Sequence, residues 1–447
     1  MKLLDRLGLG RADLRAWAMY DWANSAMVTT ITAAVFPIYY VRVAGAGLEP
    51  SQATQSYATS TTIGLTIIAV LAPLLGTLAD YVAIKKRLLG TFMGLGVAAV
   101  AMMFFIYHGD LMLASVLFIL ANIGVNGSFV FYESLLPHIA SRDEMDRVST
   151  AAYALGYIGG GLLLAVQLAW IMSPGTFGLP AGESLSPAQS TLPSRLAFLS
   201  VAIWWVGFSI PLFRQIPEPP IALEENERPG ENPLRVAFVR LAQTFRDLRG
   251  YKPAFLMLVA FLIYNDGIGT IIRMATAYGT ELGIGETPLI AAIMLVQFVG
   301  VPFSFLFGTL AGRIGTKTAI YVGLAAYIVI SILGYRMQDG RDFLVLACLV
   351  GVVQGGTQAL SRSLFASMIP KHRSGEFFGF WGVFEKFAGI FGPLIFTLTL
   401  AASGSSRNAI LSVIGFFVVG GALLAFVDVE AGRRGALAAE AEVEQLR

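Results

Sequence analysis

The sequence predicts an all-α membrane protein of twelve transmembrane helices, arranged as two pseudo-symmetric six-helix bundles. Three observations lead to this prediction: an apolar composition, a succession of apolar runs long enough to cross a bilayer, and a repeat between the two halves of the chain. Apolar residues make up 56% of the 447 residues and charged residues only 13%, whereas soluble domains contain about 25% charged residues. The length leaves room for about a dozen spans of roughly 20 residues each.

Apolar runs of suitable length follow one another along the whole chain. In the first half, spans are expected near 16–41, 55–79, 88–107, 111–137, 149–172 and 196–213. In the second half, they are expected near 253–279, 288–311, 318–335, 342–369, 377–401 and 408–428. The first run contains Asp21 and Asn24 and has no convincing cleavage site, so we interpret it as a span rather than a removable signal.

The basic residues predict the orientation of these spans. With the N-terminus inside, most of the 31 Lys and Arg residues fall on the cytoplasmic side, as the positive-inside rule requires. This group includes Lys85, Lys86, Arg87, Arg142, Arg147, Arg313, Lys317, Lys371 and Arg373. We therefore expect a multi-pass protein of a bacterial inner membrane with both termini in the cytoplasm.

A polar connector divides the chain. We expect an N-terminal bundle over 1–213, a cytoplasmic linker over 214–252, a C-terminal bundle over 253–430 and a cytoplasmic tail over 431–447. The first part of the linker is rich in proline and acidic residues, which is typical of an extended, solvated segment. Its second part places apolar residues at 4-3-4-3 spacing, at Leu234, Phe238, Leu241, Phe245 and Leu248. With arginines on its other faces, this segment predicts a basic amphipathic helix suited to the anionic inner leaflet.

Short motifs recur at matching places in the two halves. The run from Gly76 to Ala79 closes the second span and the identical run from Gly308 to Ala311 closes the eighth, an offset of 308 − 76 = 232 positions. Pro137 and Pro370 end the fourth and tenth spans at an offset of 370 − 137 = 233. Glycine pairs in the fifth and eleventh spans repeat at 233 as well: Gly156, Gly159, Gly389 and Gly392. These offsets indicate two related six-helix halves.

Two such halves joined by a long cytoplasmic connector resemble the plan of major facilitator transporters. The loop after the second span carries Gly76-x-x-x-Asp80 followed by Lys85 and Lys86, and it resembles the signature loop of that superfamily. Tyr81 and Ala83 depart from the usual pattern. We expect Asp80 to lie near a helix N-terminus or a basic side chain and to hold the inward face shut; alternatively, the basic residues serve only to set the topology.

Several longer segments resemble the vacuole-effluxer family, which is named for an autophagy-related yeast protein. They are YDWANSA at 20–26, FYESLLP at 131–137, FLIYNDGIGTI at 261–271, QGGTQALSRSLFASMIP at 354–370 and EFFGFW at 376–381. The resemblance implies export of a solute across a membrane, with amino acids as the class proposed for the eukaryotic members. It does not identify the substrate of this chain.

Charged residues inside the seventh span mark a candidate site. Asp266, Thr270 and Arg273 follow at i, i+4 and i+7 and so share a helical face. A charge at the centre of a bilayer costs about 2.5–3.5 kcal/mol on insertion scales, so these groups are expected to face a partner or an aqueous cavity. A private salt bridge between two helices is one interpretation, and a polar site at the membrane midplane is the other.

Similar polar stripes fall mainly on the first, fourth, seventh and tenth spans, which line the central cavity in the major facilitator plan. The candidate substrate-binding residues are Tyr20, Asn24, Asn122, Asn126, Asn265, Asp266, Thr270, Arg273, Gln297, Gln354 and Gln358. The candidate proton-coupling or gating residues are Asp21, Asp80, Lys85, Lys86, Glu133, Arg362, Glu385 and Lys386.

The favoured function is secondary active transport of a small, amino-acid-like solute by alternating access, with proton-coupled export. Asp266 or Asp21 is the carboxylate expected to carry the proton, because desolvation favours the protonated form. Static gate pairs in a uniporter, transport of a lysolipid or other amphiphile, and a transporter-like receptor or scaffold remain alternatives. We expect a monomer in the bilayer that binds a small solute and exchanges protons.

Other classes of function find little support in the residues. The three histidines, His108, His138 and His372, are scattered along the sequence, and no phosphate-binding loop of the GxxxxGK[ST] type is present. The acidic cluster of Asp143, Glu144 and Asp146 is interpreted as solvated. No enzyme activity, cofactor, metal or nucleic-acid partner is therefore predicted.

Overall fold

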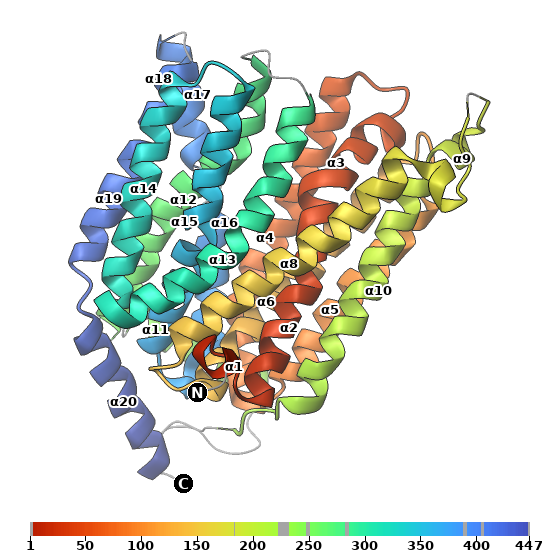
Figure 1. The fold of residues 1–447 in the computed structure, drawn as a ribbon. Helices are drawn as coiled ribbons and strands as arrows, with labels where there is room; N and C mark the ends of the chain where they lie inside the picture. The colour runs from red at the N-terminus through yellow and green to blue at the C-terminus, as the bar shows by residue number, and fades with distance from the viewer. Residues whose placement is uncertain are drawn as a thin grey trace.

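The structure, a computed structural model, describes residues 3–182, 184–221, 232–246, 251–281, 286–387, 391–403 and 406–445. In these ranges every regular element is a helix (Figure 1), which confirms the predicted all-α class. Both chain termini lie at the same end of the molecule. We call this end the base and the opposite end the mouth.

The first half of the chain contains the first six expected spans. Its first span is continuous over Ala12–Ala44 and contains two π-helical segments, η1 and η2. The elements are α1 (Leu3–Arg6), α2 (Ala12–Met27), η1 (Val28–Ala34), α3 (Val35–Tyr39), η2 (Tyr40–Ala44), α4 (Pro50–Val82), α5 (Lys85–Met102), η3 (Met103–Phe105), α6 (Leu111–Ser134), α7 (Leu136–Ile139), α8 (Met145–Met172), η4 (Pro174–Phe177), α9 (Pro187–Ser190) and α10 (Leu192–Gln215).

The second half follows the connector. Its elements are α11 (Pro233–Arg246), α12 (Lys252–Glu281), α13 (Glu286–Ile314), α14 (Thr316–Arg336), α15 (Gly340–Ser367), η5 (Lys371–Arg373), α16 (Ser374–Phe387), α17 (Phe391–Ser403), α18 (Ser406–Ser412), α19 (Ile414–Ala425) and α20 (Val429–Gln445). Among the described residues, 11 helical stretches are long and apolar enough to cross a membrane. The expected span at 377–401 is divided between α16 and α17, and residues 388–390 between them lie outside the described ranges.

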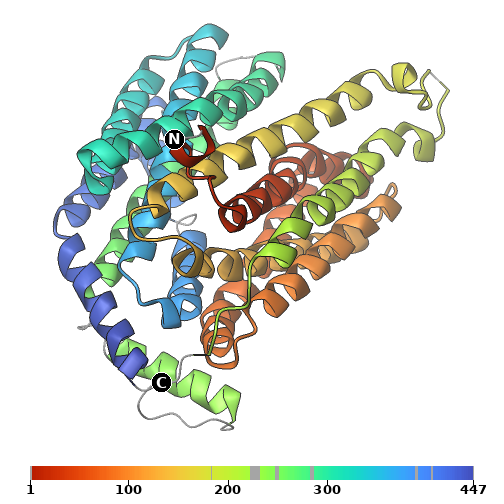
Figure 2. The same ribbon diagram turned by 60° about the horizontal axis from the view of Figure 1, so that its bottom comes forward.

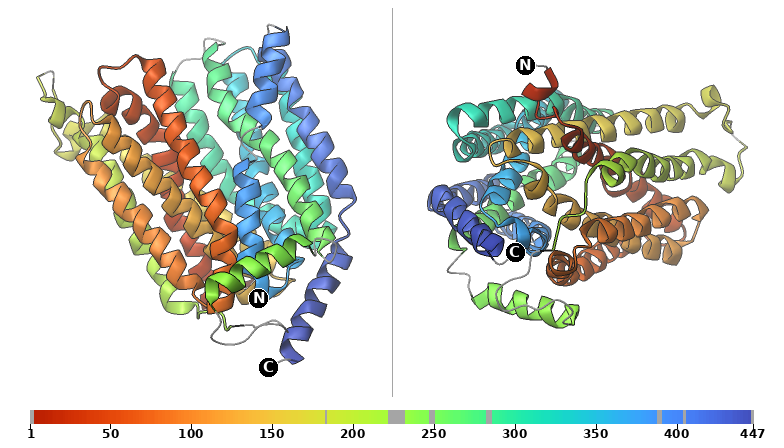
Figure 3. Two further views of the ribbon diagram at one scale, coloured as in Figure 1. Left: turned by 180° about the vertical axis from the view of Figure 1, so that it is seen from behind. Right: turned by 90° about the horizontal axis from the view of Figure 1, so that it is seen from below.

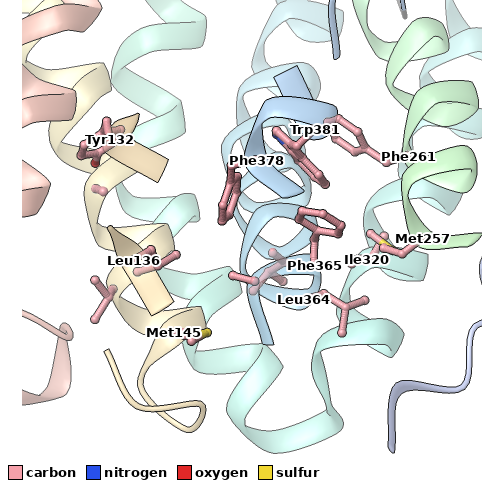
Figure 4. Packing of buried hydrophobic residues seen from close by; sticks show 14 of the residues in the cluster. Tyr132, Leu136, Met145, Met257, Phe261, Ile320, Leu364, Phe365, Phe378 and Trp381 are labelled. Carbon is pink, nitrogen blue, oxygen red and sulfur yellow. The ribbon is translucent and has the colours of Figure 1, made fainter. Parts of the chain in front are cut away.

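The largest cluster of buried apolar residues is shared by the two halves and includes their contact at the base. This core contains Trp17, Tyr132 and Leu136 from the first half together with Phe365 and Trp381 from the second. Figure 4 shows residues of α6 and α7 facing residues of α12, α15 and α16 within it. The ring of Trp381 stacks on that of Phe261, with centroids 3.9 Å apart. The two halves are therefore packed against each other at this end.

Toward the mouth, the core divides. One cluster belongs to the first half and includes Phe36, Phe118 and Phe198, while a smaller one belongs to the second half and includes Met337 and Phe343. Figures 2 and 3 show the corresponding two groups of helices, the red to yellow-green helices of the first half and the green to blue helices of the second. Because the two halves share a core at the base and have separate cores toward the mouth, they form two bodies joined at the base.

Candidate functional site

A cavity of about 920 Å³ lies between the two halves, within the range of pockets that bind small molecules. Its walls come from α2, η1, α4, α6 and α8 on one side and from α12, α13, α14, α15, α16, α17 and α18 on the other. It reaches Tyr57 near the start of α4 and Met337 after the end of α14. Both positions are at the mouth, so the cavity extends from there toward the shared core at the base.

Arg362 of α15 forms the centre of a charged floor. Its Nη1 atom lies 3.4 Å from Oδ2 of Asp21 in α2 and 3.8 Å from Oε1 of Glu133 in α6. Its Nε and Nη2 groups donate to the hydroxyl and the carbonyl oxygen of Ser149 in α8, at 2.9 and 3.1 Å. One guanidinium of the second half thus connects three helices of the first.

Aromatic rings complete the surroundings of Arg362. The guanidinium carbon lies 4.9 Å from the ring centroid of Trp17, 4.7 Å from that of Tyr153 and 5.9 Å from that of Tyr132. Such positions are favourable because the faces of aromatic rings attract cations. Trp17, Tyr153 and Ser149 were not among the predicted site residues. Trp17 could have been found, because it precedes Asp21 by four positions and so shares its helical face.

Six predicted amide side chains line the cavity around this floor: Asn24, Asn122, Asn126, Gln297, Gln354 and Gln358. Asn122 and Asn126 donate to the carbonyl oxygens one turn earlier in α6, at 2.9 and 2.8 Å. Gln297 Nε2 donates to Thr29 Oγ1 across the halves at 3.1 Å. These bonds fix the amides in place while leaving part of their hydrogen-bonding capacity toward the cavity.

Asn24 differs from the other amides of this set in its hydrogen bonding. It is fully buried, yet neither its Nδ2 nor its Oδ1 atom has a hydrogen-bond partner among the described residues. The Oε1 atom of Gln354 is in the same situation. A buried polar group without a partner costs about 1–3 kcal/mol, so a water or a bound solute that reaches these atoms would be favourable.

The two walls of the cavity differ in character. The wall of the first half carries hydroxyl and amide groups from α2, η1, α4 and α6, including Ser25, Thr29, Thr32 and Thr61. The wall of the second half toward the mouth is mostly apolar, with Ser331 as a polar exception, and includes Ile293, Val296, Ile330, Met337, Phe343, Leu346, Val350, Ile410 and Val413. The cavity is therefore suited to a solute that has polar groups on one side and an apolar group on the other.

Three predicted substrate-binding residues do not line this cavity. Tyr20 is fully buried and packs on the ring of Tyr132, with centroids 4.8 Å apart. Asn265 accepts a hydrogen bond from Gln358 Nε2 at 3.2 Å and so supports a residue of the cavity from behind. Both differ from the prediction because helical periodicity gives the shared face but not the direction in which that face points.

Asp266, the centre of the predicted midplane site, contacts a helix end instead. Its Oδ2 atom accepts the backbone N–H of Gly392 in the first turn of α17, at 2.9 Å. A hydrogen bond to a charged acceptor is stronger than one between neutral groups, so this contact ties α12 to α17. Thr270, one turn further along α12, does line the cavity, and the side chain of Arg273 lies outside the described part of the structure.

The gating candidates divide between the cavity and the base. Asp21, Glu133, Arg362 and Glu385 line the cavity, and the side chain of Lys386 is outside the described set. Lys86 contacts its own half: its Nζ donates to the carbonyl oxygen of Phe213 at 3.1 Å. Its backbone N–H donates to the carboxylate of Glu218 at 3.0 Å, and burial raises the pKa of this carboxyl group.

Asp80 and Lys85 connect the two halves at the base, in an arrangement that we call the base latch. Asp80 pairs with Lys85 at 2.7 Å and accepts the backbone N–H groups of Gly375 and Glu376, at 3.0 and 2.9 Å, in the first turn of α16. Lys85 Nζ also donates to Ser374 Oγ at 2.7 Å. The carboxylate therefore lies at a helix N-terminus and beside a cation at the same time.

His138 and Asp146 extend these contacts. His138 Nε2 lies 2.9 Å from Lys85 Nζ. Asp146 was expected to be solvated, but its carboxylate accepts the hydroxyls of Thr316 and Ser363 in the second half, at 2.6 and 2.5 Å. The expectation failed because Asp146 lies in the first turn of α8, which packs against α13 and α15.

Comparison with known sequences identifies relatives that agree with one another in family. A family model described as "Vacuole effluxer Atg22 like" matches residues 10–437. The uncharacterized MFS-type transporter YxiO of Bacillus subtilis is 38% identical over 423 residues, which cover 93% of this chain and 94% of that protein. Autophagy-related protein 22 of Yarrowia lipolytica is 26% identical over 316 residues, 64% of this chain and 51% of the yeast protein. The match thus spans about half of this fungal relative.

Solved structures confirm the predicted fold. The proton:xylose symporter XylE bound to 6-bromo-6-deoxy-D-glucose superposes with a TM-score of 0.68 at 13% identity, covering 97% of this chain and 98% of XylE. The transporter FucP in its outward conformation gives 0.68 at 13% identity, over 94% and 99% of the two chains. At this identity the likeness concerns the major facilitator fold alone.

Proposed function

The chain belongs to the Atg22-like vacuole effluxer family of MFS-type transporters, and we propose that it exports a small amino-acid-like solute by alternating access coupled to protons. The observation that carries this proposal is the cavity between the halves, which extends to the mouth and ends on the Arg362 floor. A solute entering from the base requires the base latch and the floor contacts to separate. The form seen here, with its halves joined at the base, is then the state that releases the solute at the mouth.

The chemistry of the two walls supports an amino-acid-like solute. Asn24 and Gln354 both line the cavity and carry amide atoms without a hydrogen-bond partner among the described residues, and such atoms suit a solute that has both hydrogen-bond donors and acceptors. The opposite wall, with Phe343 and Val350, suits an apolar side chain. The ammonium and carboxylate groups of an amino acid would then lie toward α2, and its side chain toward α14 and α15.

The floor supports coupling to protons. Asp21 and Glu133 both approach the same Nη1 atom of Arg362, so two carboxylates compete for one guanidinium. Two carboxylates this close together disfavour double ionisation, because their like charges repel. When one of them carries a proton, the other can pair fully with Arg362. We assign the proton to this pair rather than to Asp266, which lies outside the cavity lining and caps α17.

Export follows if the proton and the solute bind alternately at the charged floor. A proton that enters from the mouth neutralises one carboxylate and favours release of a cationic amino group bound near it. The proton leaves toward the base once the halves rearrange. The orientation with both termini in the cytoplasm, which the basic residues predict, makes this cycle an export cycle.

The apolar wall also favours a second candidate, transport of a lysolipid or similar amphiphile. Purified protein in liposomes separates the candidates by counterflow of a labelled amino acid, with large apolar amino acids, sugars and a lysolipid as competitors. Inhibition by apolar amino acids alone supports the proposal, whereas inhibition by the lysolipid alone contradicts it. Absence of counterflow with every solute tested favours a receptor or scaffold.

Proton coupling has its own test. We expect Asp21→Asn and Glu133→Gln to abolish gradient-driven transport and proton movement while counterflow persists. Asp143→Asn is the matched control, because Asp143 is exposed at the base. Gradient-driven transport that survives both cavity substitutions would show that these carboxylates do not carry the proton. Counterflow without any response to a pH gradient in the unmodified protein would indicate a uniporter.

A further inference from the structure

The helix α11 buries one of its arginines and exposes two of its apolar residues. It contains arginine at 235, 240 and 246 and no acidic residue. Arg240 is only 1% exposed, and its guanidinium lies 5.7 Å from the ring centroid of Tyr81 in α4. Phe238, in contrast, is 58% exposed, and Val239 is 47% exposed. A helix facing water normally buries its apolar side chains and exposes its charges, so the surroundings of the outer side of α11 are expected to be apolar.

The position of α11 indicates what those surroundings are. Val236, Ala237 and Arg240 are buried, and the helix packs on α4. Tyr81 is the second-last residue of α4, whose apolar stretch ends at Val82. Figure 3 shows α11, in bright green at the base, lying across the ends of the spans rather than parallel to them. A helix of 14 residues is about 21 Å long, too short to cross a hydrocarbon core of about 30 Å.

The charge of the outer side points to a lipid class. Arg235 is exposed and precedes Phe238 by three positions, so the two side chains lie on the same face. A basic residue beside exposed aromatic and aliphatic residues is the pattern of helices that lie in the interface of anionic membranes. Basic residues alone would suit many anions, but the exposed Phe238 and Val239 suit only an anion attached to acyl chains.

We propose that α11 is an interfacial helix that binds the anionic headgroups of the bilayer surface. Phe238 and Val239 enter the boundary of the acyl chains, and Arg235 lies at the level of the phosphates. Arg240 binds to the protein instead and holds the helix on Tyr81, next to Asp80 of the base latch. The inference does not depend on the identity of the transported solute.

The depth of position 238 tests this proposal directly. We would attach a nitroxide to Phe238→Cys in a Cys348→Ser background and reconstitute the protein in phosphatidylcholine alone or mixed with phosphatidylglycerol. We expect collisions with oxygen to exceed those with a water-soluble nickel chelate, and nickel collisions to fall several-fold further when phosphatidylglycerol is present. Glu442→Cys, on the exposed side of α20, is the control and should remain accessible to nickel in both lipids. A label at 238 that is as accessible to nickel as the label at 442 in both lipids would overturn the proposal.

A second comparison separates a local lipid site from a general effect of net charge. Arg235→Gln, combined with the label at 238, should remove most of the response to phosphatidylglycerol. Arg341→Gln removes the same charge from an exposed position at the mouth and should leave the response unchanged. Raised ionic strength should weaken the response in the unmodified protein, because salt screens exposed charges. Equal losses in the two arginine variants would contradict a site on α11.

Discussion

The Nη1 atom of Arg362 lies 3.4 Å from the Oδ2 atom of Asp21, although the two residues are 341 positions apart in the chain. This contact joins α15 of the second half to α2 of the first at the bottom of the cavity. Both side chains are almost completely buried, although both residues line the floor of the cavity. In the proposed transport cycle, the solute, the proton and the closure of the base all involve this guanidinium.

Replacement of Arg362 should open this floor. In Arg362→Gln, two carboxylates remain buried without their cation, a change that costs about 3–5 kcal/mol when one partner of a buried pair is removed. We expect a lower thermal midpoint and loss of transport. Arg341→Gln, at an exposed position of the same helix, should change neither. A normal midpoint in Arg362→Gln would show that the pair is not needed to hold the halves together.

Loss of the charge on Asp80 should weaken the base latch. Asp80→Asn removes the ion pair with Lys85 and weakens the bonds to the N–H groups of α16. Hydrogen bonds to charged groups contribute about 1.5–3 kcal/mol, so we expect roughly a 30-fold shift away from the base-closed state. Spin labels at Arg87→Cys and Arg313→Cys, one at the base of each half, would report it as a longer distance. Asp143→Asn should leave the distance unchanged, and an unchanged distance in Asp80→Asn would contradict the latch.

Acidification should weaken the base latch through His138. Lys85 Nζ donates to Asp80, Ser374 and the Nε2 atom of His138, and Nε2 can accept that bond only while the imidazole is neutral. Protonation places a cation against Lys85, in surroundings where Lys371 and His372 add positive charge and Asp80 is the compensating acid. The stabilisation is therefore present at high pH and is lost as the pH falls through the titration of His138.

The same label pair at positions 87 and 313 measures this effect. The base distance should lengthen on acidification of the unmodified protein. His138→Gln keeps an acceptor but cannot titrate, so its distance should stay constant with pH. His108→Gln, at the mouth, is the control and should retain the full response. A pH response that survives in His138→Gln would assign the effect to another group.

Much of the architecture could be predicted from the sequence because span length, hydropathy and charge bias are local properties. The same holds for the Asp80 motif, which depends on residues adjacent in the chain. The direction of each polar stripe could not be predicted, because it depends on how a helix rotates against its neighbours. Asn24 lines the cavity, whereas Tyr20, one turn earlier on α2, packs against Tyr132.

The role of Asp266 could not be predicted from the sequence for a different reason. Its partner Gly392 lies in α17, far from Asp266 in the chain. In the sequence, a buried carboxylate in an apolar span is equally consistent with a binding group and with a helix cap. Only the position of the second helix decides between them.

Substitution of Asp266 should therefore affect stability more than solute binding. Asp266→Leu removes the acceptor of the Gly392 N–H, and loss of a cap costs about 0.5–2 kcal/mol. We expect a lower thermal midpoint with an almost unchanged affinity for the solute identified by counterflow. Asn24→Leu should do the opposite, because Asn24 lines the cavity and its amide has no hydrogen-bond partner among the described residues. A large loss of affinity in Asp266→Leu at an unchanged midpoint would restore Asp266 to the binding site.

The close approach of the two halves at Gly76 gives a purely steric test of closure. A Cβ atom added to Gly76 would collide with the backbone carbonyl of Gly375, at the same base contact that Asp80 caps. Gly76→Ala should therefore lengthen the base distance between labels 87 and 313 and reduce transport, although alanine favours the helix itself by about 1 kcal/mol. Gly94→Ala in α5 is the matched control, because a Cβ there meets no atom within 4 Å. It should gain the helical stabilisation and keep the base closed. If Gly76→Ala behaves like Gly94→Ala, the halves do not approach as closely as this base contact requires, and closure at the base must depend on the charged groups alone.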